Sequence, residues 1–490
     1  MAAVAQCLAR HSKAPWGATL FKWRSSRSFV LSVVCFAGMT DMLLYGLIIP
    51  ILPNALSEKV KLPLGELQRW TSILLALYGA AMAMTSLLCG YLVDRTASRR
   101  WLFVVGLTGL AVATTLLCIG SHLSLWILGR LLQGGAAAVV WTVGMTLLVD
   151  RYQEDALGNA LGYFAMSTVI GATAGPLLGG VLYEHAGYYA PFGLAFALIA
   201  LDLALRMMII ETEKDQVPFE HSTDMELSQI SVDERQSDHQ DTPPAATAAS
   251  GGRKGASASS REDDTSSNPE FMDPSSRSSR QPTNHKAVFA LLRSPRMVLA
   301  LTVYFLLSTT LTAFDSALPL FVRDTFGWKQ SAQGLIFIPL MVPHVLDPGI
   351  GYIVDRWPKT RCYLITTGLL AMVPLMVSLR YITENSIGHK VLLCTLLALI
   401  GGCVELIETP TMVEVTNRAL EASTAWPGAL GRNTAIALAC GLCNSAFAAG
   451  SMAGPFLGGF IRDHAGWKTM SWALAVPTGV WGILVLLFLC

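Results

Sequence analysis

Charged residues are scarce in this sequence. They make up 14% of the 490 residues, whereas soluble domains carry about 25%. Many of these charges lie in one interior segment, roughly 212–296, so the remainder of the chain is poorer still. Outside that segment, apolar runs of about 20 residues recur, and each is long enough to cross a hydrocarbon core of about 30 Å. The composition excludes a soluble globular protein and indicates a polytopic membrane protein.

The sequence also lacks the usual signatures of catalysis and of resident cofactors. It contains no Walker loop, no nucleophile elbow and no cluster with the spacing of metal ligands. Its ten cysteines are scattered and most of them lie inside apolar runs, so we interpret them as small buried hydrophobic residues. We expect no enzyme activity, no metal and no cofactor. Without a nucleotide site, any work across the membrane must draw on an ion gradient.

Twelve apolar segments are present, in two groups of six. The first group lies at about 28–53, 70–93, 101–121, 123–149, 159–183 and 191–211. The second lies at about 297–322, 332–354, 362–381, 390–416, 433–461 and 468–490. We therefore predict an all-α membrane protein with an N-terminal six-helix bundle at 28–211 and a C-terminal six-helix bundle at 297–490.

Basic residues in the short loops gather on one side of the predicted bundle. Those after helices 2 and 8 are Arg95, Arg99, Arg100, Arg356, Lys359 and Arg361. Since basic loops favour the cytoplasm, we expect both termini to be cytoplasmic. Residues 1–27 are basic and free of acids, which fits a cytoplasmic flank of helix 1; a targeting presequence is the alternative. Residues 212–296 are rich in Ser, Asp, Glu, Pro and Gly, which predicts a disordered cytoplasmic linker.

The two groups of six are repeats. The stretch Gly162–Gly180 returns as Gly441–Gly459, with every glycine and the proline of G-x8-G-x3-G-P-x2-G-G displaced by 279 positions. GYLVDR after helix 2 returns as GYIVDR after helix 8, and a membrane aspartate precedes a proline in helices 1 and 7. Parallel repeats of this kind predict a substrate site near the middle of the membrane, between the halves.

Glycine and proline are disfavoured inside helices, by about 1 and 3 kcal/mol relative to alanine, so their repetition needs a reason. Small residues allow helices to pack closely in a membrane. We predict such packing, in a seam that opens and closes, for Gly162, Gly171, Gly175, Pro176, Gly179, Gly180, Gly441, Gly450, Gly454, Pro455, Gly458 and Gly459. For the repeated loops we predict gating locks formed by Gly90, Asp94, Arg95, Gly351, Asp355 and Arg356.

These motifs resemble those of the major facilitator superfamily. GYLVDRTASRR at Gly90–Arg100 resembles the family's signature loop, with departures at Ala97 and Ser98, and LWILGRLLQGGAAA at Leu125–Ala138 resembles its helix 4 motif. The glycine-proline stretch of helix 5 resembles the motif associated with antiporters. The sequence around Asp41 and Phe314–Val322 is similar to that of fungal drug:proton antiporters related to vesicular amine transporters.

Charges inside the membrane cost about 2.5–3.5 kcal/mol each, so the few that occur are candidates for coupling. They are Asp41, Arg130, Asp315, Glu405 and Glu408. Burial disfavours the charged form of a carboxylate, which suits the four acids to proton exchange; fixed structural pairing is the alternative for each. The resemblance implies that Arg130 links the protonation of a neighbouring acid to the conformational change.

Aromatic residues near the predicted cavity can stack on an organic substrate or cation. They are Tyr45, Tyr78, Trp141 and Tyr304, and core packing is the alternative for each one. Asp202 and Arg206 have the i, i+4 spacing of an intrahelical ion pair, so we interpret them as scaffold. Glu414 lies nearer the cytoplasmic end of helix 10 and is expected only to flank it.

Together these features predict a proton-coupled exporter of small organic molecules that works by alternating access. The alternatives are a proton symporter or facilitator that imports a nutrient, and a non-transporting receptor on the same fold. The expected partners are a small organic substrate, protons and the lipid bilayer, with no nucleic acid, and we expect a monomer. The plasma membrane is the expected location, with a vacuolar or vesicular membrane as the alternative.

Overall fold

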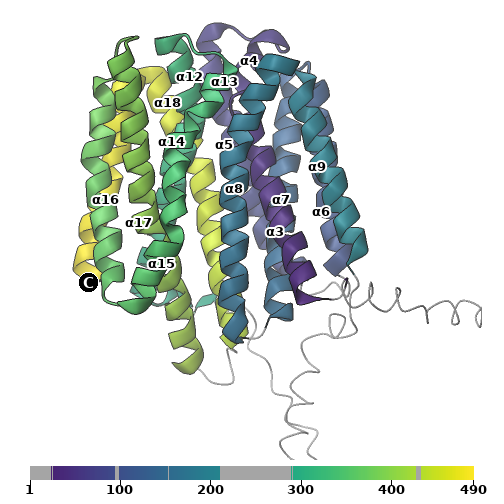
Figure 1. The fold of residues 1–490 in the computed structure, drawn as a ribbon, viewed down its shortest axis with the longest axis vertical. Coiled ribbons are helices and arrows are strands. Elements are labelled where there is room, and N and C mark those ends of the chain that lie inside the picture. Colours follow the sequence, from purple (N-terminus) through teal and green to yellow (C-terminus); the bar gives the residue numbers. More distant parts are fainter. Residues whose placement is uncertain are drawn as a thin grey trace, which may run out of the picture.

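The computed structural model describes residues 24, 26–93, 99–152, 154–209, 288–289, 291–425 and 432–489. All structural statements below refer to these residues. Most of the predicted N-terminal flank, 1–27, and most of the predicted linker, 212–296, lie outside them. The described chain is helical throughout, with short connections between the helices (Figure 1).

The first half contains six long helices. They are α3 (Arg27–Ile48), α5 (Leu67–Val93), α6 (Arg99–Ile119), α7 (Leu123–Arg151), α8 (Glu154–Ala186) and α9 (Tyr189–Met208), with the short α4 (Leu52–Glu58) between α3 and α5. Ser26 caps the start of α3, where its side chain accepts a hydrogen bond from the backbone N–H of Phe29 at 3.2 Å. Gly187, with φ of +84°, follows α8 and allows the chain to turn into α9.

The second half repeats this pattern with two irregularities. Its helices are α12 (Pro295–Phe326), α13 (Gln330–Leu335), α14 (Phe337–Met341), η4 (Val342–Leu346), α15 (Asp347–Arg356), α16 (Thr360–Ser378), α17 (Ile387–Ala425) and α18 (Arg432–Phe488). The predicted helix 332–354 is therefore four short pieces. Pro339, Pro343 and Pro348 lie in it, and each lacks the N–H group that would continue the helical hydrogen bonding. The predicted helices 433–461 and 468–490 both lie in α18, where Gly466 at φ of +81° marks the turn.

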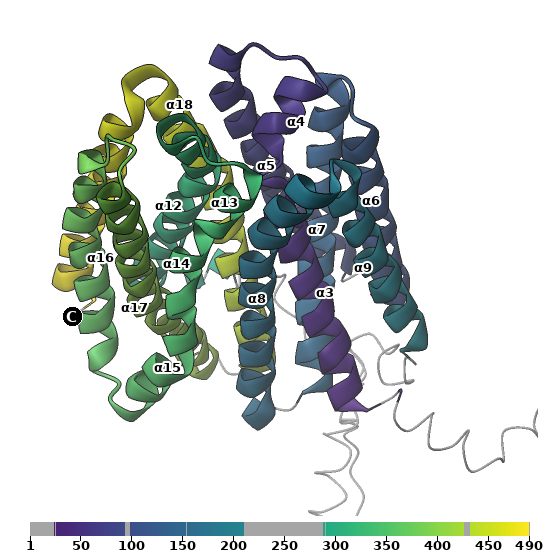
Figure 2. The same ribbon diagram turned by 45° about the horizontal axis from the view of Figure 1, so that its top comes forward.

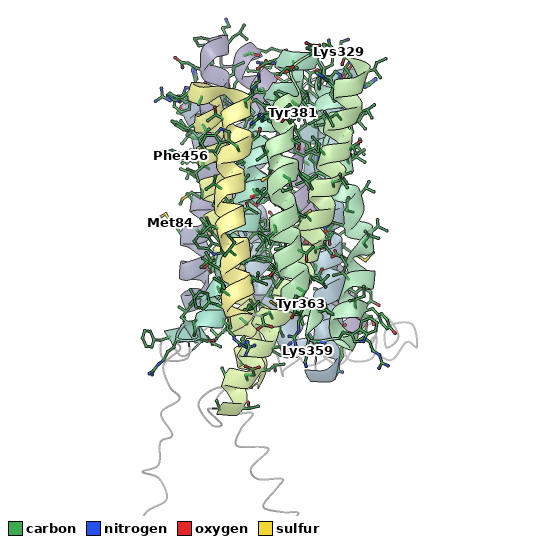
Figure 3. All side chains as sticks on the ribbon, turned by 90° about the vertical axis from the view of Figure 1, so that its left-hand side faces the viewer. Met84, Lys329, Lys359, Tyr363, Tyr381 and Phe456 are labelled. Carbon is green, nitrogen blue, oxygen red and sulfur yellow. The ribbon has the colours of Figure 1, made fainter. Side chains whose placement is uncertain are left out.

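Ten stretches of the described chain are long and apolar enough to cross a membrane. They match the expected spans except that α5 is not among them and that α18 is counted once. Helix α5 and the second segment of α18 complete the twelve predicted helices. The outer surface agrees with this assignment, because large apolar side chains such as Met84, Tyr363, Tyr381 and Phe456 lie exposed on it (Figure 3).

The helices stand side by side in two groups, α3–α9 and α12–α18 (Figures 1 and 2). We call the end of the bundle that contains α4 the upper end and the end at which α3 begins the lower end, as in Figure 1. The groups meet where α5 packs along α18 and where α8 packs along α13 and α14. The functional residues lie along these two contacts and between them.

Candidate functional site

The glycine-proline stretch of α8 packs closely against α3. A Cβ atom added at Gly175 would lie 2.6 Å from the carbonyl oxygen of Leu43, and one at Gly171 or Gly179 would meet the carbonyl oxygen of Met39 or Leu47. Such distances leave no room for a side chain. The close packing predicted for this stretch is thus present between α8 and α3.

The repeated stretch of α18 packs in the same way against α12. A Cβ atom at Gly450 would lie 2.5 Å from the carbonyl oxygen of Phe305, and one at Gly458 would lie 2.6 Å from the Cβ of Ala313. At Gly454 it would meet the carbonyl oxygen of Thr309. The two stretches therefore hold equivalent helix pairs, one in each half of the molecule.

The second glycine of each doublet faces the other half instead. Gly180 of α8 lies against the backbone of Gln330 at the start of α13, and Gly459 of α18 lies against the side chain of Ser72 on α5. The backbone of Pro176 also leaves no room for a Cβ atom at Gly334 of α13. These contacts join the halves in the upper part of the bundle.

Two of the predicted packing glycines and one glycine of the predicted gating locks have no close neighbour. A Cβ atom at Gly162 or Gly441 would have no described atom within 4 Å, so the structure does not form the predicted close packing there, and the same is true of Gly351 in the repeated loop. Asp94 and Arg95 lie outside the described residues, as does the side chain of Asp355, and Arg356 is exposed. Gly90 lies within α5, in a part whose surroundings are not described.

Polar contacts between the halves reinforce the upper end. Glu184 accepts a hydrogen bond from the backbone N–H of Ser331 at 3.0 Å. Arg462 on α18 donates to the side-chain oxygen of Gln68 on α5 and pairs with Asp324 on α12 at 2.9 Å. The amide nitrogen of Gln68 donates to the carbonyl oxygen of Ser316 at 3.1 Å. In this conformation the upper end is closed.

Asp41 and Asp315 lie in the middle of the bundle, and aromatic side chains hold both. Asp41 is 1% exposed and accepts a hydrogen bond from the indole N–H of Trp141 on α7 at 3.0 Å. Its other carboxylate oxygen is buried, and the hydroxyl group of Tyr78 is a neighbouring donor. Tyr45 of α3 donates to Asp315 of α12 at 3.0 Å and so connects the two halves. The structure thus brings both predicted acids to the interior.

Arg130 lies beside this group and is fully buried. Its guanidinium carbon is 5.4 Å from the ring centroid of Tyr45 and 5.0 Å from that of Tyr78, and the two rings are 4.8 Å apart. It donates to the carbonyl oxygen of Leu74 at 3.2 Å and to the side-chain oxygen of Gln133 at 2.7 Å. It forms no ion pair with a described carboxylate, and its terminal Nη2 has no described acceptor. The expected neighbouring acid is instead reached through Tyr45.

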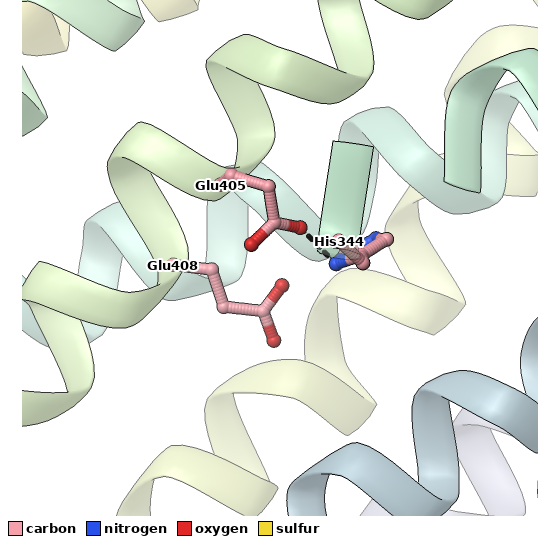
Figure 4. A group of neighbouring side chains, drawn as sticks. All are labelled: His344, Glu405 and Glu408. Carbon is pink, nitrogen blue, oxygen red and sulfur yellow. Dashed lines mark ion pairs between the residues drawn. The ribbon is translucent and has the colours of Figure 1, made fainter. Parts of the chain in front are cut away.

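The acids of the second half belong to a separate cluster. Glu405 is buried on α17 and forms an ion pair with His344 of η4. Glu408, one turn later, accepts a hydrogen bond from Tyr304 of α12 at 3.3 Å. Figure 4 shows both carboxylates on the same side of α17, turned toward His344. Glu405 and Glu408 are close to each other, as expected, and His344 lies beside them.

Sequence reasoning missed His344 and Asp347. Both lie in the apolar segment 332–354, within Pro343–Pro348, which reads PHVLDP. A histidine and an aspartate between two prolines in a predicted span were a usable signal, since ionisable groups in such segments are rare. Asp347 lies 3.9 Å from the histidine nitrogen and accepts a hydrogen bond from Thr409 at 2.6 Å.

Two scaffold expectations need correction. Asp202 and Arg206 are both buried and attract each other electrostatically, but they are not in direct ion-pair contact, and neither carboxylate oxygen of Asp202 has a described hydrogen-bond partner. Arg206 instead lies over the ring of Phe103, 3.2 Å from its centroid. Glu414 does more than flank its helix, because it bridges Arg361 at 3.3 Å and Arg418 at 2.7 Å.

Sequence comparison identifies a family and several relatives of this chain. Residues 34–426 match the Major Facilitator Superfamily. An MFS-type transporter, ppzB, of Metarhizium rileyi is 31% identical over 479 residues, which cover 97% of this chain and 96% of the relative. A probable vesicular acetylcholine transporter-B of Danio rerio is 27% identical over 205 residues, or 41% of each chain.

The fold is also found among solved structures. The nucleoside transporter NupG superposes with a TM-score of 0.62 at 12% identity, over 94% of this chain and 99% of the other. This likeness concerns the fold alone. The family match spans most of the chain, and two helical halves enclose buried charges that meet between them. The chain is therefore a member of the Major Facilitator Superfamily, a secondary transporter and not an enzyme.

Proposed function

We propose that this transporter exports small organic molecules in exchange for protons, by alternating access. The observation that carries the proposal is the hydrogen bond between Tyr45 and Asp315, which joins the halves at the middle of the bundle with Arg130 against the tyrosine ring. A carboxylate accepts such a bond best when it is ionised. Protonation of Asp315 therefore weakens a contact that holds the two halves together.

Arg130 makes this contact sensitive to charge. Its guanidinium stays protonated under ordinary conditions, so it stabilises an ionised Asp315 nearby through the Tyr45 ring and hydroxyl. When Asp315 takes up a proton, this attraction is lost and the halves separate more easily. In the proposed cycle, this step releases the upper end and exposes the interior to the other side of the membrane.

Asp41 supplies the second acid and the place for the substrate. Its buried carboxylate and the rings of Tyr45, Tyr78 and Trp141 suit a substrate with a cationic group, because aromatic faces and a carboxylate both attract cations. The partial match to a vesicular acetylcholine transporter supports this choice of substrate class. Substrate and proton would then compete for Asp41.

The proton gradient is sufficient for this work. One proton that moves through 100 mV supplies about 2.3 kcal/mol, and one pH unit adds about 1.4 kcal/mol. Together these support roughly a 500-fold gradient of a neutral substrate. One-for-one exchange of a monovalent cation for a proton moves no net charge, so the pH difference alone acts and one pH unit supports about a tenfold gradient. We further propose that Glu405 and Glu408 take part in proton coupling as the acids of the second half. We also propose that both termini are cytoplasmic and that the protein works as a monomer in the plasma membrane.

Purified protein in liposomes tests the proposal. Acid-loaded vesicles with a trapped pH indicator are given organic cations outside, and antiport predicts proton efflux that requires both the substrate and the protein. Co-directional movement of protons and substrate would establish a symporter instead. No response to a broad set of compounds, with binding intact, would favour a receptor. Tyr45→Phe removes only the hydroxyl, so we expect weaker coupling with substrate binding retained.

A further inference from the structure

The second polar cluster of the interior has the composition of a metal site. His344, Glu405 and Glu408 each offer one ligand atom, and these atoms lie within 4.8 Å of one another. The three side chains converge from two elements, η4 and α17 (Figure 4). We propose that this cluster binds a divalent transition-metal ion, such as Zn²⁺, Co²⁺ or Mn²⁺.

The surroundings of Glu405 support a cation at this place. Its side chain is 1% exposed, and apart from the close contact of one oxygen with the His344 ring neither carboxylate oxygen has a described hydrogen-bond partner. Its one described partner is the His344 ring, to which it is linked as an ion pair. A buried carboxylate that lacks donors is costly. A metal ion between Glu405, Glu408 and His344 would satisfy it.

The geometry agrees with first-row metals. Ligand atoms bound at about 2.0–2.1 Å in a tetrahedral site lie roughly 3.3 Å apart. Since all the candidate ligand atoms lie within 4.8 Å of one another, the widest separation needs only a modest closure, while the close contact between His344 and Glu405 would open to admit the ion. The set of one imidazole and two carboxylates suits Zn²⁺, Co²⁺ and Mn²⁺ better than Mg²⁺ or Ca²⁺, which prefer oxygen ligands alone.

Neighbouring residues hold the ligands in position. Tyr304 donates to Glu408 at 3.3 Å, and the carboxylate of Asp347 lies 3.9 Å from the His344 nitrogen while Thr409 donates to it at 2.6 Å. Hydrogen bonds from such outer residues orient metal ligands. The short helix η4, which follows from the interruption by Pro343, is what presents His344 to α17.

The site shares Glu405 and Glu408 with the proposed acids of the second half but contains neither Asp41 nor Asp315. Failure of proton antiport at Asp41 and Asp315 would therefore leave metal binding untouched. Failure to bind metal would leave the proposed coupling through the Tyr45–Asp315 hydrogen bond intact. An ion at this place would tie η4 to α17, two elements of the second half, and would therefore stabilise that half.

Cobalt binding tests the inference directly. Protein purified without a polyhistidine tag is placed in nanodiscs and titrated with Co²⁺, with visible absorption as the readout, and Zn²⁺ is then added as the competitor. We expect one saturable ion per chain, displaced by Zn²⁺ and not by equal Ca²⁺ or Mg²⁺. His344→Ala should weaken binding at least 10-fold. The matched control is His464→Ala, because His464 is exposed at a helix end and should not contribute.

Glu408→Gln is the second variant, in case His344→Ala does not fold. It keeps the size of the side chain and its contact with Tyr304 but loses the charge, so Co²⁺ affinity should also fall at least 10-fold. Absence of saturable binding in the wild-type protein would overturn the proposal. So would binding that both variants retain, or binding that His464→Ala abolishes.

Discussion

Gly180 and Gly459 occupy equivalent positions in the two repeats, and each lies against the opposite half of the molecule, on Gln330 and Ser72. Their neighbours Gly179 and Gly458 lie against α3 and α12 of their own halves. In each doublet, the first glycine packs within its own half, and this contact is kept throughout the cycle. The second glycine packs against the other half, and this contact must break when the halves separate. This division gives the repeated stretch a mechanical role that packing alone does not provide.

Gly180→Ala should impair transport without unfolding the protein. The added methyl group would collide with the backbone of Gln330 in the other half, so the closed upper end becomes unfavourable while packing within the first half is unchanged. We expect transport to fall at least 10-fold at near-normal thermal stability. Gly162→Ala, on the same helix with no neighbour within 4 Å, is the matched control and should transport normally.

Gly175→Leu should act differently, because its neighbours are the backbone atoms of α3 within the same half. Here the expected result is a lower melting temperature together with lost transport. If the Gly175 and Gly180 variants had the same melting temperature and the same transport activity, the distinction between contacts within a half and contacts between the halves would be wrong.

Arg130→Lys should reduce transport although the charge is kept. Lysine lacks the planar guanidinium that contacts the Tyr45 and Tyr78 rings and donates to both Leu74 and Gln133. We expect at least a 10-fold loss of proton-coupled transport, or about 1.4 kcal/mol. The exposed Arg380→Lys provides the control. Full coupled transport by Arg130→Lys would show that charge alone is sufficient.

Asp41→Asn should separate proton coupling from folding. The amide keeps an oxygen that can accept from Trp141 at the observed 3.0 Å, so the local packing is preserved. It cannot exchange a proton, and we therefore expect substrate-driven proton movement to disappear. Equilibrium binding of a radiolabelled substrate would report whether the cavity still binds. If this variant retained full coupled transport, the assignment of Asp41 would be wrong.

The sequence predicted the helices well because their apolar length is set by the membrane and requires no knowledge of contacts. It also predicted that Asp41, Arg130 and Asp315 would lie inside. It did not predict the hydrogen bond from Tyr45 to Asp315, which places Asp315 near Arg130, because the two bonded residues are 270 positions apart in the sequence. The pairing of Glu405 with His344 was missed because a break at Pro343 was hidden within an apolar segment.

Arg462 offers the clearest test of closure at the upper end. Its guanidinium contacts Gln68 of the other half and Asp324 of its own, so Arg462→Met would remove a bridge across the gate while its apolar stem is largely kept. We expect the upper end to open more often, which should raise the labelling rate of a cysteine introduced at Ser72 on α5, near that bridge.

The control variant is Lys468→Met, an exposed substitution beyond the Gly466 turn, which should leave the labelling rate unchanged. Because the bridge is partly exposed, the expected change is a few-fold, in line with about 1 kcal/mol for such contacts. Equal labelling of the two variants would mean that the glycine contacts, and not Arg462, hold the upper end closed.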